Sequence, residues 1–82
     1  MGTEIKIVYR DGSGVAKVIA NTFSEAELLL KNINSRNYTI LVRNSQSKYI
    51  ETSTNQRGAL IKLEKIKRFV AEDYNYSKMQ NA

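Results

Sequence analysis

The chain has 82 residues, which is enough for one small domain and too few for two. It contains no cysteine and no histidine, which excludes disulfides, the usual structural zinc sites and histidine-dependent catalytic triads. Thirteen Lys and Arg against eight Asp and Glu give a net charge of +5, which favours anionic partners without requiring one.

The first part of the chain predicts two strands joined by a tight turn. Residues 4–10 and 15–21 alternate between apolar and other side chains, the period of two that is typical of half-buried strands. The glycines between them do not fit a phosphate-binding loop, because a strand and not a helix follows. Gly12 and Ser13 suit the centre of a type II′ turn. A type I′ turn one residue earlier shifts the strand partners and keeps the same faces.

A helix is predicted next, from about residue 24 to residue 34. Ser24 followed by Glu27 has the spacing of a capping box, in which the hydroxyl and the carboxylate satisfy free backbone N–H groups. An apolar stripe follows at helical spacing: Ala26, Leu29, Leu30 and Ile33. Asparagines then end the helix, because this residue tolerates C-cap conformations.

The second half of the chain repeats the same order of elements. Residues 38–44 read as a third strand, with Ile40 and Val42 on one side. Residues 48–53 read as a weaker fourth strand after a polar loop, and Ile50 is assigned to the same side as Ile40. The predicted order is therefore strand, strand, helix, strand, strand, helix.

The last element is predicted to be a helix with one apolar stripe: Ala59, Leu63, Ile66 and Val70. Either Ser53 paired with Gln56, or Thr54, is expected to cap its start. Gly58 lowers the helix propensity of the first turn by roughly 1 kcal/mol relative to Ala. From about residue 75 the periodicity is lost, and the C-terminal tail is expected to fray.

These elements predict a single α+β domain over residues 1–82. Each helix has one apolar stripe and needs a sheet to cover it, so the simplest packing has two layers. We expect a four-stranded antiparallel sheet in the order 2-1-3-4, with both helices on one face. The other face is left uncovered, with a predicted apolar centre of four residues: Val8, Ile19, Leu41 and Tyr49. Four cations are predicted around that centre: Lys6, Arg10, Lys17 and Arg43.

This uncovered face is the candidate functional surface. An apolar centre with a charged rim, on a face expected to be wet, is typical of an interface. The leading expectation is a non-enzymatic binding module that acts through protein–protein contact and self-associates through this face as a homodimer, with another protein as the other candidate partner. The alternative is a nucleic-acid-binding protein, with the four cations on phosphates and Tyr49 stacked on a base.

Other functions have less support in the sequence. No nucleophile–base pair can be named, so we expect no enzyme, no cofactor and no metal site. The basic residues of the last helix are spread around its circumference and do not form a recognition helix. No apolar run reaches the roughly 18–20 residues that cross a bilayer, and no secretory signal is visible, so we expect a cytoplasmic protein without membrane contact. The abundance of Asn, Ser, Lys and Tyr is typical of low-GC bacteria, their phages and mobile elements.

Overall fold

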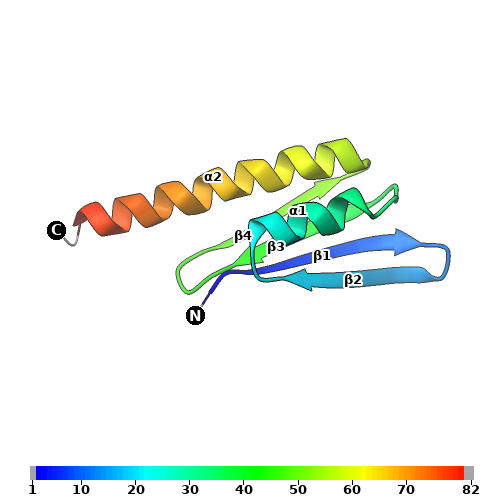
Figure 1. The fold of residues 1–82 in the computed structure, drawn as a ribbon, viewed down its shortest axis with the longest axis horizontal. Coiled ribbons are helices and arrows are strands. Elements are labelled where there is room, and N and C mark those ends of the chain that lie inside the picture. The colour runs from blue at the N-terminus through cyan, green and yellow to red at the C-terminus, as the bar shows by residue number, and fades with distance from the viewer. Residues whose placement is uncertain (1, 81–82) are drawn as a thin grey trace.

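The computed structural model describes residues 2–80, with side chains described up to residue 72. It confirms the predicted α+β fold: four antiparallel strands form one sheet in the order β2-β1-β3-β4, and two helices lie on one face (Figure 1). The elements are β1 (Glu4–Asp11), β2 (Gly14–Ala20), α1 (Phe23–Lys31), β3 (Tyr38–Arg43), β4 (Lys48–Ser53) and α2 (Gln56–Gln80). Helix α1 packs on β1 and β2, whereas α2 packs on β3 and β4.

The β1–β2 hairpin has the predicted faces and a different turn. Tyr9 pairs with Ala16, so both strands direct the expected side chains toward the helices. A type II′ turn requires a positive φ at Gly12. Among the described residues the positive φ belongs to Gly14 instead, at 124°, so the predicted turn type is wrong. Asp11 supports the turn by accepting a backbone N–H two residues further on, at 2.7 Å.

The core lies between the sheet and the two helices. Its buried side chains are Ile5, Ile7, Ala20, Ala26, Leu30, Ile33, Tyr38, Ile40, Val42, Ala59, Leu63 and Ile66. Ile5 and Ile7 of β1, and Tyr38, Ile40 and Val42 of β3, contribute to it at every second position, as the period of two predicts. Among the residues whose side chains are described, Tyr38 brings the one buried side-chain hydroxyl, which is hydrogen-bonded to Ile33 O, and no charged side chain is buried.

Helix α1 begins earlier than the sequence pattern indicated. Its N-cap is Thr22, whose Oγ1 accepts the backbone N–H of Glu25 at 3.1 Å. The prediction of Ser24 as the cap, with Glu27 as its partner, was therefore wrong. Both hydroxyl residues are followed by a Glu three positions later, so the local pattern fits twice. The earlier start places Phe23 inside the helix, where it packs against the core. The helix also ends three residues before the predicted position.

Helix α2 is capped by Asn55 and not by Ser53 or Thr54, which the sequence pattern favours. Asn55 Oδ1 accepts the backbone N–H of Gly58 at 2.6 Å, and Asn55 O accepts that of Ala59 at 3.0 Å. Neither Ser53 nor Thr54 is the cap. Ser53 supports it instead, because its Oγ donates to Asn55 O at 2.9 Å.

Gln56, predicted to complete a capping box for its own helix, serves α1 instead. Its Nε2 donates to the carbonyl oxygens of Leu30, Lys31 and Ile33, at 2.9, 3.1 and 2.8 Å. The hydroxyl of Tyr38 also donates to Ile33 O, at 2.8 Å. Carbonyls at and just beyond the C-terminal end of α1 therefore receive donors from β3, five residues further on, and from α2, 23 to 26 residues further on.

We expect Gly58→Ala to destabilise the protein, although alanine has a higher helix propensity than glycine. Propensity alone would stabilise the first turn of α2 by about 1 kcal/mol. A Cβ at this position would, however, overlap Ser53 Oγ and lie 3.0 Å from Asn55 Oδ1, so the cap hydrogen bonds would have to shift. Loss of a cap costs about 1 kcal/mol, to which the displaced Ser53 bonds add. Urea unfolding should show a net loss of about 1 kcal/mol.

The matched control for this prediction is the same substitution in a Ser53→Ala background. Removing the Ser53 hydroxyl makes room for the new Cβ, so adding Gly58→Ala there should cost less than it does in the natural chain. A stabilised Gly58→Ala single variant would show that the cap accommodates the methyl group without loss.

Helix α2 extends well beyond the sheet (Figure 1). Its 25 residues correspond to roughly 37 Å at 1.5 Å per residue. The six-residue strands β3 and β4 reach only about 20 Å. The backbone is helical as far as Gln80, whereas the sequence pattern indicated fraying from about residue 75.

Candidate interface on the uncovered face of the sheet

No element among residues 2–80 covers the sheet face opposite the helices, and we call it the outer face (Figure 1). Strand alternation and pairing place these residues on it: Glu4, Lys6, Val8, Arg10, Val15, Lys17, Ile19, Thr39, Leu41, Arg43, Lys48, Ile50 and Thr52. All four strands contribute to this surface, so its composition depends on the pairing register of each strand.

One row of the outer face is largely apolar and crosses the whole sheet. The register places Ile19 beside Lys6, Lys6 beside Leu41, and Leu41 beside Ile50. Ile19 is 50% exposed and Ile50 is 54% exposed, whereas Lys6 and Leu41 are half-buried. Val15, on the same face, is 69% exposed. The row forms an apolar strip with one amine at its centre.

The outer face is strongly cationic. Its charged residues are five cations, Lys6, Arg10, Lys17, Arg43 and Lys48, and one carboxylate, Glu4. Arg43 Nη2 lies 3.3 Å from Glu4 Oε1, in an exposed ion pair. Lys6, Arg43 and Lys48 also line a shallow hollow of about 140 Å³, together with Glu4 and Leu41. Positive charge is therefore concentrated directly beside the apolar row.

Tyr49, predicted at the apolar centre of this face, lies on the helix side of the sheet. Its ring stacks on Phe69 of α2, with ring centroids 6.2 Å apart and planes inclined by 15°. The prediction that Tyr49 faces outward and Ile50 inward was wrong. The other predicted residues, Val8, Ile19 and Leu41, do lie on the outer face, where Ile50 takes the place of Tyr49. The four predicted cations lie there too, joined by Lys48.

The length of the β3–β4 loop explains this reversal. Asn44 N donates to Ser47 O at 3.0 Å, which closes a four-residue loop and pairs Arg43 with Lys48. The next pair is Val42 with Tyr49, so the inward-facing Val42 brings Tyr49 inward as well. A loop with one residue more or fewer would have turned Ile50 toward the core.

Glu51, two residues after Tyr49 on β4, also faces the helices. Its carboxylate lies 3.2 Å from Lys62 Nζ and 3.5 Å from Lys65 Nζ, both on α2. The hydrogen bond from Lys62 holds the pKa of Glu51 below its ordinary value, assisted by the charge of Lys65 and opposed by partial burial. These contacts attach α2 to β4, so the three residues serve the fold and not the candidate interface.

We expect Glu51→Gln to lower the free energy of unfolding by about 1 kcal/mol or less at neutral pH, the range of partly exposed ion pairs. Because the pKa of Glu51 is depressed in the folded protein, its contribution is present above the unfolded value near 4.5 and is lost as the pH falls further. The difference between wild type and variant should therefore disappear at about pH 2–3. Urea unfolding at both pH values measures it.

Glu64→Gln is the control for this pH dependence. Glu64 is exposed on α2, the helix that carries Lys62 and Lys65, and it forms no ion pair with another described residue. It should leave the stability nearly unchanged at both pH values. A Glu51→Gln effect that persisted at low pH would show that the ion pairs are not its cause.

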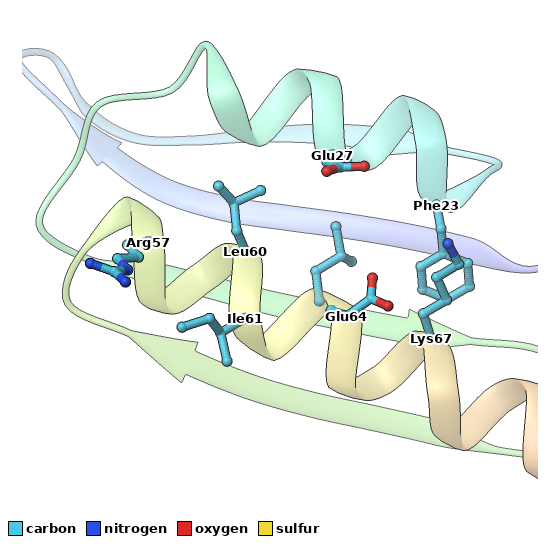
Figure 2. Close-up of a pocket in the computed structure, with 8 residues that line it drawn as sticks. Phe23, Glu27, Arg57, Leu60, Ile61, Glu64 and Lys67 are labelled. Carbon is cyan, nitrogen blue, oxygen red and sulfur yellow. The ribbon is translucent and has the colours of Figure 1, made fainter.

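A second concave surface lies between the two helices (Figure 2). It has a volume of about 290 Å³ and is lined by Phe23, Glu27, Arg57, Leu60, Ile61, Leu63, Glu64 and Lys67. Figure 2 shows Leu60 directed from α2 toward α1, with Glu27 above the groove. Its two carboxylates and two cations balance one another, so the groove has no preference for a charged partner. The outer face is the stronger candidate.

No helix in the part of the chain that the structure describes is long and apolar enough to cross a membrane. Comparison of the chain with protein families, with curated proteins and with solved structures finds no match. The geometry and the charge of the outer face therefore carry the functional inference.

Proposed function

We propose that this chain is a non-enzymatic protein-binding module and that the outer face is its docking surface. The observation that supports the proposal is the set of exposed aliphatic side chains on this face. Val15, Ile19 and Ile50 are each at least half exposed, at 69%, 50% and 54%. The uncovered face of an antiparallel sheet is normally polar, whereas here a row from Ile19 through Leu41 to Ile50 is interrupted only by Lys6, and such apolar surface is typical of an interaction site.

The geometry gives less support to nucleic-acid binding. With Tyr49 against Phe69, no aromatic side chain lies on the described outer face, and base stacking is the main sequence-tolerant contact with single strands. Four strands at about 4.8 Å spacing span roughly 14 Å between the edge strands, which is wider than the ~12 Å major groove. The positive charge of the outer face still favours nucleic acid.

The non-enzymatic part of the proposal is supported by the described side chains. Apart from Tyr38, whose hydroxyl is hydrogen-bonded to Ile33 O, no polar or charged side chain among them is buried, so they offer no unpartnered group in a desolvated environment that would tune its reactivity. The sequence also has no histidine and no cysteine to act as general base or nucleophile.

The proposal is tested with two double variants that add the same charge at different places. Ile19→Lys with Ile50→Lys changes the outer face. Leu28→Lys with Ile61→Lys is the matched control, because these helix residues are similarly exposed, at 63% and 61%. We expect chemical cross-linking in nuclease-treated extracts of the source cells to capture a partner with wild type and control and not with the outer-face variant. If the partner is a second copy of the chain, light scattering on the three purified proteins detects it as a dimer.

Two results would contradict this function. Capture that is equal for all three proteins would place the binding surface elsewhere. Capture that depends on intact nucleic acid, and is lost on nuclease treatment, would favour the nucleic-acid alternative. Circular dichroism spectra of both double variants should match that of the wild type, because all four positions are exposed.

A further inference from the structure

The fold gathers nearly all of the net charge of the chain on the outer face. The whole sequence has thirteen cations and eight carboxylates, a net charge of +5. Five of these cations and one of these carboxylates lie on the outer face, which leaves it with a net charge of +4. The remaining eight cations and seven carboxylates nearly cancel. The apolar row and the net charge therefore share one surface.

The cations cannot be separated from the apolar row when a partner binds. Lys6 is half-buried between Ile19 and Leu41, within the row itself. Lys48 lies two residues before Ile50 on the same strand and face, and Lys17 pairs with Val8. A partner that covers the row must also remove water from these amines, which is unfavourable unless it supplies negative charge.

Two of these amines are available to such a partner. Neither Lys6 nor Lys48 forms an ion pair with another residue that the structure describes, whereas Arg43 is paired with Glu4. Both line the hollow of about 140 Å³ beside Leu41. A carboxylate placed in this hollow would meet two amines while the adjoining apolar side chains of the partner cover the row.

We propose that the outer face binds an acidic protein surface, with an apolar centre and a rim of Asp and Glu side chains, and not a second copy of this chain. The inference depends on the proposed function, since it names the partner of the same face. A second copy would oppose two faces of net charge +4 and bury amine against amine. Nucleic acid supplies the negative charge and offers no apolar surface that matches the aliphatic row.

The test uses acidic polymers of known chemistry as probes. A fluorescent random copolymer of Glu and Tyr presents carboxylates with apolar rings, poly-Glu presents carboxylates alone, and single-stranded and duplex DNA present phosphates. Binding is measured by anisotropy at about 50 mM salt, where charge contacts are strong. We expect wild type to bind the Glu–Tyr copolymer more tightly than poly-Glu or either DNA.

Two charge-reversal variants with the same net charge show whether binding depends on the position of the cations or only on the net charge of the protein. Lys17→Glu with Lys48→Glu changes the outer face, and Lys67→Glu with Arg68→Glu changes exposed positions on α2. The first pair should weaken copolymer binding by about tenfold or more, and the second by less than about threefold, because only close charges contribute strongly at a contact.

Each other result overturns the inference in a distinguishable way. Equal weakening by both pairs would mean that binding follows net charge and not the outer face. A wild-type dimer that Ile19→Lys with Ile50→Lys dissociates would overturn the inference and leave the proposed function intact. DNA bound more tightly than the copolymer, with the same sensitivity to Lys17→Glu and Lys48→Glu, would overturn both. If the wild type binds no copolymer, the inference is overturned and the proposed function is not, because the function is tested by the capture experiment.

Discussion

Replacing Gln56 by Glu should lower the free energy of unfolding by about 3 kcal/mol, the largest effect that we expect from one polar substitution here. The Gln56 amide nitrogen donates to Leu30 O, Lys31 O and Ile33 O, two of these bonds being partly buried. A carboxylate at this position cannot donate and would place negative charge against three carbonyl oxygens. It would also sit at the negative end of the α1 dipole. Gln56→Leu, which removes the donor without adding charge, should cost about 2 kcal/mol.

Urea unfolding at neutral pH and at about pH 3 measures this effect. The penalty of Gln56→Glu should shrink at the lower pH, because a protonated carboxyl group can again donate to one carbonyl. Asn34→Asp is the control, since it makes the same amide-to-carboxylate change at an exposed position just beyond the end of α1. This control should change stability by less than about 0.5 kcal/mol. A Gln56→Glu variant as stable as Asn34→Asp would show that the three hydrogen bonds do not hold α1 in place.

Because Tyr49 faces the helices and Ile50 faces outward, lysine at these two neighbouring positions of β4 should affect stability very differently. Tyr49→Lys should lower the free energy of unfolding by about 2 kcal/mol, because it removes the stacking on Phe69 and part of the core contact. It would also place an amine near Lys65, whose Nζ lies 5.9 Å from the Phe69 ring centroid. Ile50→Lys should change stability by less than about 0.5 kcal/mol, because Ile50 is 54% exposed on the outer face.

The same pair of variants separates stability from binding. Denaturant midpoints measure the stability of each variant, and anisotropy with the Glu–Tyr copolymer measures its binding. Ile50→Lys should remain folded while losing apolar contact area at the candidate interface. If Ile50→Lys were the destabilised variant and Tyr49→Lys the stable one, β4 would have the facing that the sequence pattern first indicated.

The facing of strands β1 and β3 could be predicted from the sequence because only one of the two alternating sets in each strand is wholly apolar or aromatic. Ile5 and Ile7 in β1, and Ile40 and Val42 in β3, belong to that set and are buried, whereas Val8 and Leu41 share the other set with polar and charged residues. In β4 the local pattern offers two adjacent candidates, Tyr49 and Ile50. Hydropathy favours the isoleucine, but register favours the tyrosine, and register depends on the loop and on the partner strand.

The helix ends were harder to predict because several neighbouring residues fit the same capping pattern and because Gln56 has distant hydrogen-bond partners. Local spacing favours Ser53 and Gln56 as a capping pair for α2. In the structure Asn55 caps α2, and the side chain of Gln56 reaches carbonyls 23 to 26 residues earlier in the chain. A rule that compares positions three apart cannot detect such a contact.

The order of the elements, the α+β class and the total charge follow from the sequence alone, because they depend on short-range periodicity and composition. The sheet order could be predicted as well, since a short right-handed crossover leaves few alternatives. Which side chains share the outer face, by contrast, depended on tertiary packing. The four-residue loop after Arg43 set the register of β4, turned Tyr49 toward Phe69, and brought Ile50 and Lys48 beside Leu41. The candidate interface depends on that pairing, because neighbours across a sheet are set by register and not by distance along the chain.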